Sequence, residues 1–219
     1  MSIIYNIFRR IRISYGITVC NEVHELRLLM DTLLPIVDKR DEIILLQDIT
    51  LEDEEVTSLI SSYGNKIKHI KAKLNGDFST FKNKLISASS GDYLFQIDAD
   101  ELPKPSLIKG IKQVLRKKYK ADCFLVPRIN IVEGLTADHI KNWNWTVDAQ
   151  NRANYPDHQF RIFKLDGRIK WRNKIHEELE GFTRSYHLPS ETEEWCLVHV
   201  KSIGKQVAQD QLYSKIISQ

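Results

Sequence analysis

The stretch Tyr93–Glu101, YLFQIDADE, decides the fold of this chain. It joins a run of β-type apolar residues directly to three carboxylates, Asp98, Asp100 and Glu101. Carboxylates packed so closely repel each other unless a cation neutralises them. Hard oxygen ligands suit Mg²⁺ or Mn²⁺, and such ions commonly keep phosphate oxygens in their shell. The stretch therefore predicts a strand that ends in a metal site for a diphosphate, with a solvated acidic turn before Pro103 as the alternative.

Strand-like and helix-like patterns alternate on both sides of this stretch. Besides Tyr93–Ile97, short β-type runs are predicted at Tyr15–Cys20, Glu42–Gln47, Lys66–Ile70 and Cys123–Ile131. Apolar residues three and four positions apart predict helices within 26–37, 56–63, 78–88 and 107–115. This alternation predicts an α/β fold with a mostly parallel, Rossmann-like sheet flanked by helices. Ligands of such sheets bind beyond the carboxyl ends of the strands, here near residues 18–22, 47–50 and 98–101.

The second half of the chain has a less regular pattern. Lys141–Pro156 is polar and aromatic and is predicted to be a loop or flap. Phe160–Lys164 and Ile169–Trp171 flank Asp166-Gly167, which predicts a β-hairpin. The tail from Ser202 onward predicts a C-terminal helix. We therefore expect one domain over 1–219, with a nucleotide-binding half at 13–131 and a short acceptor-side half at 132–219.

Composition places the chain among ordinary soluble globular proteins, because 42% of its 219 residues are hydrophobic and 28% are charged. The net charge of +3 requires neither a nucleic acid nor a membrane, and we expect no nucleic-acid partner. Three separated cysteines, Cys20, Cys123 and Cys196, favour a reducing, cytoplasmic compartment. Met1–Arg12 is too short in its apolar part for a signal peptide. We expect it to pack on the domain edge, with peripheral contact at the inner membrane face as the alternative.

Four segments, taken in order, resemble the nucleotide-binding half of family-2 glycosyltransferases with the A-type (GT-A) fold. They are Ile17–Glu22, Ile43–Thr50, Asn75–Asn83 and Gly91–Pro103, and the resemblance covers roughly residues 13 to 131. The sequence departs from the family pattern in two places. Cys20 stands where an aromatic residue often stacks on the base, and Gln47-Asp48-Ile49 replaces the usual Asp-Asp-Gly.

The resemblance implies a donor site that includes the residues at these strand ends. They are Thr18, Cys20, Glu22, Asp48, Lys82, Asp98 and Ala99. Asp48 follows a buried strand, and its carboxylate can accept from the imide N–H of a uracil-like base, so we expect a UDP-sugar donor. Each residue also has an ordinary interpretation, since Asp is common in any turn and Lys82 can be a solvated lysine.

The second half is similar to a bacterial subgroup, the lipopolysaccharide core β-glucosyltransferase-like proteins. The similar segments are Tyr155–Phe163, Trp171, His176-Glu177 and His199–Lys201. The resemblance implies Asp157 as the base, with Glu177 as second choice. It places His199 with Asp98 and Asp100 in the metal shell, and Lys201 and His176 near the donor. The alternatives are a turn at Asp157, a surface pair at His176-Glu177 and a hydrogen-bonded core histidine at His199.

Taken together, the resemblance implies a metal-dependent, inverting glycosyltransferase that uses Mn²⁺ or Mg²⁺ and acts on a hydroxyl of a glycan or glycolipid. Direct displacement at the anomeric carbon needs a carboxylate to take the acceptor proton and positive charge on the departing diphosphate. Two other classes are weighed against it. A non-catalytic sugar-nucleotide or glycan-binding module is consistent with Cys20 and the short second half. A sugar-phosphate nucleotidyltransferase is disfavoured, because Cys20–His24 contains no glycine.

Overall fold

The computed structural model of the protein describes residues 10–217, with side chains described up to residue 211. The predicted leader Met1–Arg12 therefore lies outside the described residues over its first nine positions. Within the described part of the chain, no helix has both the length and the apolar character needed to cross a bilayer. Cys20, Cys123 and Cys196 are all free thiols.

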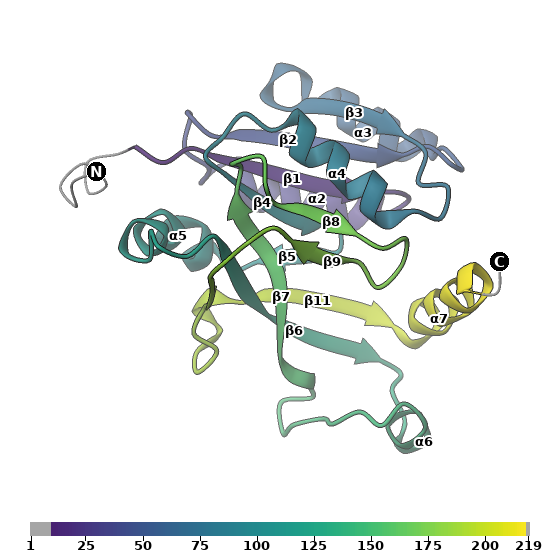
Figure 1. The fold of residues 1–219 in the computed structure, drawn as a ribbon. Helices are drawn as coiled ribbons and strands as arrows, with labels where there is room; N and C mark the ends of the chain where they lie inside the picture. Colours follow the sequence, from purple (N-terminus) through teal and green to yellow (C-terminus); the bar gives the residue numbers. More distant parts are fainter. Residues whose placement is uncertain (1–9, 218–219) are drawn as a thin grey trace.

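A nine-stranded sheet forms the centre of the molecule, in the order β3-β2-β1-β4-β7-β6-β11-β5, with β10 paired to β6 (Figure 1). Its strands are β1 (Ile13–Val19), β2 (Glu42–Asp48), β3 (Lys68–Ala72), β4 (Tyr93–Asp98), β5 (Glu101–Pro103), β6 (Cys123–Glu133), β7 (Ala153–Lys164), β10 (Ser185–His187) and β11 (Leu197–Ser202). All of them run the same way except β5 and β7, which pair antiparallel with their neighbours. The predicted α/β fold with a mostly parallel sheet is confirmed.

Helices cover both faces of this sheet because its strands are apolar on both sides. One face packs against α2 (Val23–Leu33), α3 (Glu54–Ser62) and α5 (Pro105–Lys117). The other face packs against α4 (Phe78–Ala88) and a second, two-stranded sheet of β8 (Lys170–Arg172) and β9 (Glu178–Glu180). Two short 3₁₀ turns, Gly64–Lys66 and Glu193–Trp195, and the helices α6 (Ala137–Asn142) and α7 (Ile203–Ile217) complete the structure.

The helices predicted from periodicity are confirmed, and so is the C-terminal helix, α7. The third strand lies at Lys68–Ala72, two residues later than predicted, because a 3₁₀ turn occupies Gly64–Lys66. The predicted flap also contains regular structure, since it begins in the last turn of α6 and ends in the first residues of β7.

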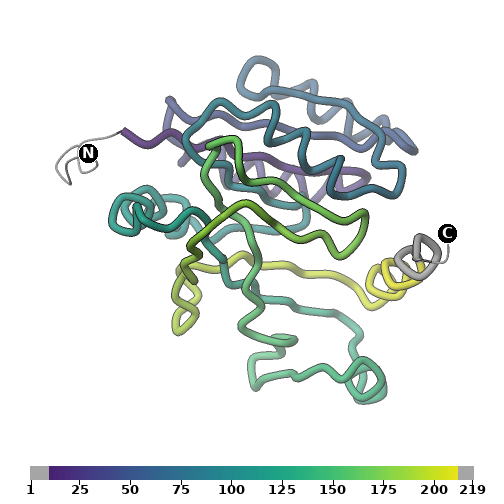
Figure 2. Tube along the Cα trace, viewed as in Figure 1, coloured from purple at the N-terminus to yellow at the C-terminus, as the bar shows by residue number. Residues whose placement is uncertain are grey.

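The predicted hairpin across Asp166-Gly167 is wrong. The chain does turn there, and Gly167 has a φ of 81°, which glycine adopts without strain. However, β7 pairs with β4 and β6, whereas β8 pairs with β9 in the second sheet. The turn therefore passes the chain from one layer to the next (Figure 2). Burying β7 inside the main sheet satisfies its backbone on both sides, which pairing with the three-residue β8 would not do.

One side chain links the second sheet to the first, and its replacement should weaken the fold. Trp171 of β8 is 5% exposed, and its Nε1 donates a hydrogen bond of 2.9 Å to Oε1 of the fully buried Gln96. Trp171→Phe would leave that oxygen buried without its donor. We expect the free energy of unfolding to fall by about 1–3 kcal/mol, as measured by urea denaturation. An unchanged midpoint would show that the bond contributes nothing to stability.

Candidate active site

Cross-strand register gathers the polar side chains of the site on neighbouring strands. Arg128 of β6 lies opposite Asp157 of β7, and Asn130 of β6 lies opposite His199 of β11. His199 in turn lies opposite Glu101 of β5. Figure 2 shows how β11, near the end of the chain, returns to lie beside β6. Directly opposed residues of paired strands have neighbouring side chains, so this register builds the site.

A buried guanidinium group ties the acidic stretch to the sheet. Nη2 of Arg161, on β7, donates to Oδ2 of Asp98 at 2.7 Å and to Oε1 of Glu101 at 2.5 Å. The side chain of Glu101 is fully buried and also accepts from Nη1 of Arg128 at 2.9 Å. Burial alone would raise the pKa of Asp98, but the charges of Arg161 and Lys82 outweigh it and hold that pKa below its ordinary value.

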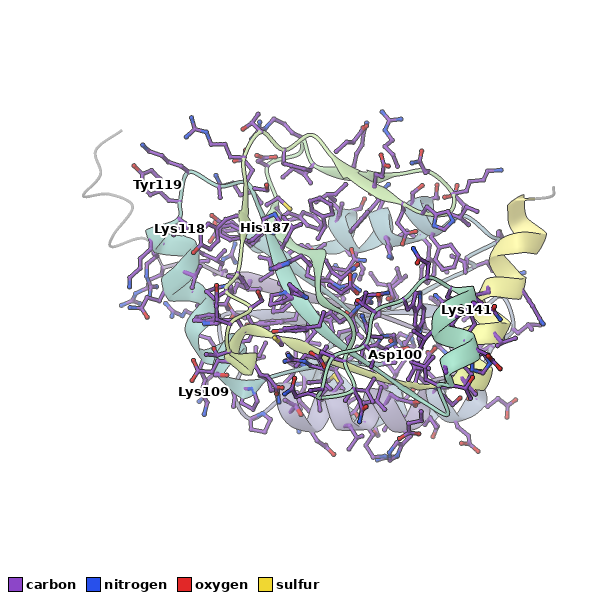
Figure 3. All side chains as sticks on the ribbon, turned by 90° about the horizontal axis from the view of Figure 1, so that it is seen from below. Asp100, Lys109, Lys118, Tyr119, Lys141 and His187 are labelled. Atoms are coloured by element: carbon purple, nitrogen blue, oxygen red, sulfur yellow. The ribbon has the colours of Figure 1, made fainter. Side chains whose placement is uncertain are left out.

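Asp100 and His199 face each other at the carboxyl end of β4. Nε2 of His199 lies 3.2 Å from Oδ2 of Asp100, and Nδ1 of the same ring lies 3.0 Å from Oδ1 of Asn130. The side chain of Asp100 is 29% exposed and that of His199 is 9% exposed, so solvent reaches the pair through Asp100. In Figure 3, Asp100 lies toward the side of the molecule that carries Lys141 of α6.

The metal ligands proposed from the sequence are therefore only partly brought together. Among residues 10–211, no group of three His, Cys, Asp or Glu side chains is placed to hold a metal ion. Asp100 and His199 form a pair, whereas Asp98 is held by Arg161 and by a 2.6 Å hydrogen bond from Oγ1 of Thr18. A metal shared by Asp98, Asp100 and His199 stays a prediction.

Asp157 is held in one orientation by its neighbours. Its Oδ2 accepts from Nε and Nη2 of Arg128 at 3.0 and 2.7 Å and from Nδ2 of Asn130 at 2.8 Å. Its Oδ1 accepts from Nε2 of Gln159 at 2.6 Å. Burial would raise the pKa of Asp157, but Arg128 and the hydrogen bonds lower it below its usual value. The carboxylate is thus ionised at neutral pH and still 24% exposed.

On the donor side, Asp48 is the last residue of β2 and is 7% exposed. Its Oδ1 accepts from the backbone N and Oγ1 of Thr50, at 2.8 and 2.6 Å, and from the backbone N of Leu74 at 3.0 Å. These bonds fix the loops after β2 and β3 at the carboxyl edge. They also fix the orientation of the second oxygen of Asp48.

The loop after β1 is ordered by Glu22. Its Oε2 accepts from the backbone N of Cys20 at 2.8 Å and of Asn21 at 3.1 Å, just before α2 begins. Burial raises the pKa of Cys20 to about 11, so the side chain is a neutral thiol. Ala99 is buried and donates its N–H to the carbonyl of Thr18 at 2.9 Å, which joins this loop to the acidic stretch.

Lys82 and Glu177 form an ion pair on the α4 side of the sheet, and the charge of Lys82 also acts on Asp98. Nζ of Lys82 also lies 5.0 Å from the ring centroid of Trp171. His176, next to Glu177, has a φ of 50°. Lys201 lies on β11, where its Nζ donates to Oε1 of Gln209 in α7 at 3.3 Å. Burial and the charge of Arg128 lower the pKa of Lys201. The candidate residues therefore form two groups. Glu177 and His176 lie with Lys82 on the α4 side of the sheet, whereas Asp157 lies on β7 and His199 on β11, the strands on either side of β6.

Three residues that sequence reasoning did not assign to the site are central to it. Arg128 and Asn130 hold Asp157, and Arg161 neutralises Asp98 and Glu101. A signal for two of them is present in the sequence. Arg128 and Asn130 stand at alternate positions of a strand that is otherwise apolar from Cys123 to Val132, so their side chains point to the same face. Two polar residues on one face of a buried strand indicate a polar site.

The α/β fold, with a mostly parallel sheet flanked by helices, is the fold of the GT-A glycosyltransferase structures that it matches. The chain belongs to glycosyl transferase family 2, whose profile matches residues 14–203. It is similar to "SPbeta prophage-derived glycosyltransferase SunS" of Bacillus subtilis (strain 168) and to "Glycosyltransferase SunS" of Bacillus phage SPbeta. Each is 27% identical over 175 residues, which are 79% of this chain. The chain spans 36% of the length of each relative.

Solved structures of S. aureus TarS share the fold. The structure of TarS residues 1–349 with UDP superposes with a TM-score of 0.59 at 13% identity, over 94% of this chain and 65% of that one. The complex with UDP-GlcNAc gives 0.58, also at 13% identity, over 87% of this chain and 58% of that one. At this identity the likeness concerns the fold alone. The finer resemblance to lipopolysaccharide core β-glucosyltransferase-like proteins stays a prediction.

Proposed function

We propose that this chain is the donor-binding and catalytic part of a metal-dependent, inverting glycosyltransferase that moves a sugar from a UDP-sugar to an acceptor hydroxyl on a glycan or glycolipid. The observation that carries the proposal is the pair of Asp100 and His199, with Nε2 and Oδ2 3.2 Å apart at the carboxyl edge of the sheet. Membership of family 2 supports the reaction class. TarS, which shares the fold and is described with UDP-GlcNAc, supports the donor class.

Asp100 and His199 are the residues that would hold a divalent cation. Mg²⁺ is usually held by one or two carboxylates together with substrate phosphates, and imidazole is a good ligand for transition metals, so a two-residue site fits Mg²⁺ or Mn²⁺. When bound, the ion supplies positive charge to the departing diphosphate. Asp98 stays the predicted third ligand, and its carboxylate is held by Arg161 and Thr18.

The acceptor proton would pass to Asp157. Its Oδ2 is saturated by Arg128 and Asn130, so Oδ1, which accepts only from Gln159 among the described residues, is the oxygen that would take the proton. Glu177 remains the second candidate, but its ion pair with Lys82 places it in the group on the α4 side. On the donor side, the second oxygen of Asp48 would accept from the uracil imide.

The metal assignment is tested by isothermal titration of UDP into the protein with and without Mn²⁺. We expect Mn²⁺ to strengthen UDP binding by the wild-type protein, and Asp100→Ala to bind UDP with the same affinity whether Mn²⁺ is present or not. Circular dichroism should show the same fold, because Asp100 is partly exposed and lies outside the strands. Equal metal-dependent binding in both proteins would overturn the assignment.

The reaction class is tested by incubating the wild-type protein with UDP-glucose or UDP-GlcNAc and Mn²⁺ and measuring the release of UDP. Slow hydrolysis, with water in place of the acceptor, is the expected result. Metal-dependent binding of UDP with no release on any acceptor of a glycan panel would instead favour the non-catalytic binding module.

A further inference from the structure

Four side chains form one continuous chain of hydrogen bonds across three strands and the acidic turn. Asp157 accepts from Nδ2 of Asn130 at 2.8 Å. Oδ1 of Asn130 lies 3.0 Å from Nδ1 of His199, and Nε2 of His199 lies 3.2 Å from Oδ2 of Asp100. The chain thus runs from the proposed base to Asp100, and Asn130 joins Asp157 to His199 within it.

The direction of each bond follows from counting donors and acceptors. Both ends of the chain are carboxylates, which only accept when they are ionised. Asn130 has one donating and one accepting end, and its NH₂ must face Asp157 because that carboxylate has no proton to give. Its oxygen therefore faces His199 and requires a proton on Nδ1. A neutral imidazole carries one proton, and Nδ1 has it.

This leaves Nε2 of His199 as a bare lone pair directed at the carboxylate of Asp100. Two acceptors 3.2 Å apart repel each other unless positive charge lies between them. Either a second proton on the ring or a metal cation supplies this positive charge. Nε2 with its lone pair exposed is also the form in which a histidine binds a metal.

We propose that Asn130 is a positioning residue that fixes the tautomer of His199 and so presents Nε2, beside Asp100, to the divalent cation. This inference rests on the proposed metal-dependent function. Asn130 lies directly opposite His199 in the parallel pairing of β6 and β11, so backbone register holds its amide against the ring. Asp157 acts on His199 through Asn130, because the carboxylate of Asp157 determines which end of the Asn130 amide faces the imidazole ring.

The tautomer of His199 is measured by two-bond ¹H–¹⁵N NMR of the metal-free protein labelled at histidine. In the wild-type protein we expect Nδ1 of His199 to carry a proton in every populated state. In Asn130→Ala the ring loses the acceptor at Nδ1, so the tautomer with its proton on Nε2, bonded to Asp100, should become populated. A bare Nδ1 in the wild-type protein would overturn the proposal.

The consequence for the metal is measured by titrating Mn²⁺ into the protein saturated with UDP. We expect Asn130→Ala to bind Mn²⁺ about tenfold to 100-fold more weakly, the usual effect of removing a partner of a metal ligand. Asn130→Asp keeps an acceptor for Nδ1–H and should retain the wild-type tautomer, while it replaces the donor to Asp157 with a second carboxylate. The matched control is Asp122→Asn, next to the opposite end of the same strand, where Asp122 bonds Thr183 and Lys164. It should lower stability and leave Mn²⁺ affinity unchanged.

The outcomes separate this inference from the proposed function. If the wild-type protein binds Mn²⁺ and Asn130→Ala binds it equally well, the positioning role is wrong and the metal site stands. If the wild-type protein binds no Mn²⁺ in the presence of UDP, the metal-dependent function and the positioning role are both overturned. Loss of Mn²⁺ affinity in Asp122→Asn as large as in Asn130→Ala would mean that the effect reports general destabilisation.

Discussion

Arg161→Leu is expected to lower the free energy of unfolding by about 3–5 kcal/mol, the cost of breaking a buried ion pair by removing one partner. Arg161 is 3% exposed, and its Nη2 donates to both Asp98 and Glu101. The side chain of Glu101 is fully buried, so the substitution would leave a carboxylate out of water with only Arg128 to neutralise it. Chemical denaturation monitored by circular dichroism measures the change.

A matched control is available on the surface of the molecule. Arg168 is 53% exposed and pairs with Asp166 across two positions of a turn. Arg168→Leu should change the free energy of unfolding far less than Arg161→Leu does, since exposed ion pairs contribute little. Equal losses in the two variants would contradict the view that Arg161 stabilises the acidic stretch through burial.

Asp157→Asn is expected to slow the release of UDP from a UDP-sugar by about 10²–10⁴-fold, the range that a positioned general base contributes. UDP binding in the presence of Mn²⁺ should stay near the wild-type value, because the amide oxygen can still accept from Arg128 and Asn130. The variant would therefore separate the chemical step from donor binding. Steady-state release of UDP and isothermal titration of UDP provide the two measurements.

Glu177→Gln is the control for this prediction, since Glu177 is the rival base. It breaks the ion pair with Lys82 and should affect donor affinity more than the rate of UDP release at saturation. If Glu177→Gln loses the chemical step while Asp157→Asn retains it, the two assignments must be exchanged. If both variants retain the step, the base lies elsewhere.

The first half of the fold could be predicted from the sequence because its helices and strands follow from residues that are close together along the chain. Apolar spacing along 23–33, 54–62 and 78–88 determines which helix faces meet the sheet, and consecutive strands with helical crossovers must run parallel. Strand pairing in the second half depends on residues far apart. Nothing in the pattern around Asp166-Gly167 indicates that β7 lies between β4 and β6, and the local turn signal therefore suggested the wrong partner.

The candidate site, like the fold, could be predicted only where the sequence information is local. The acidic stretch and His199 could be proposed from motif order, and the structure places Asp100 and His199 together. The basic residues that surround them could not, because a charged residue within an apolar strand becomes informative only when its partner is known. The role of Arg128 follows from its ion pairs with Asp157 and Glu101, which lie 29 and 27 positions away along the chain.

The pairing of β5 with β11 has a consequence for biosynthesis. His199 and Asp100 stand 99 positions apart, and they meet only after the strand that carries His199 has been added to the sheet. A ribosome releases residues in order, so a nascent chain carries its acidic turn long before it carries the imidazole. Under the proposed function, affinity for manganese should therefore arise only after His199 has left the ribosome and β11 has joined the sheet.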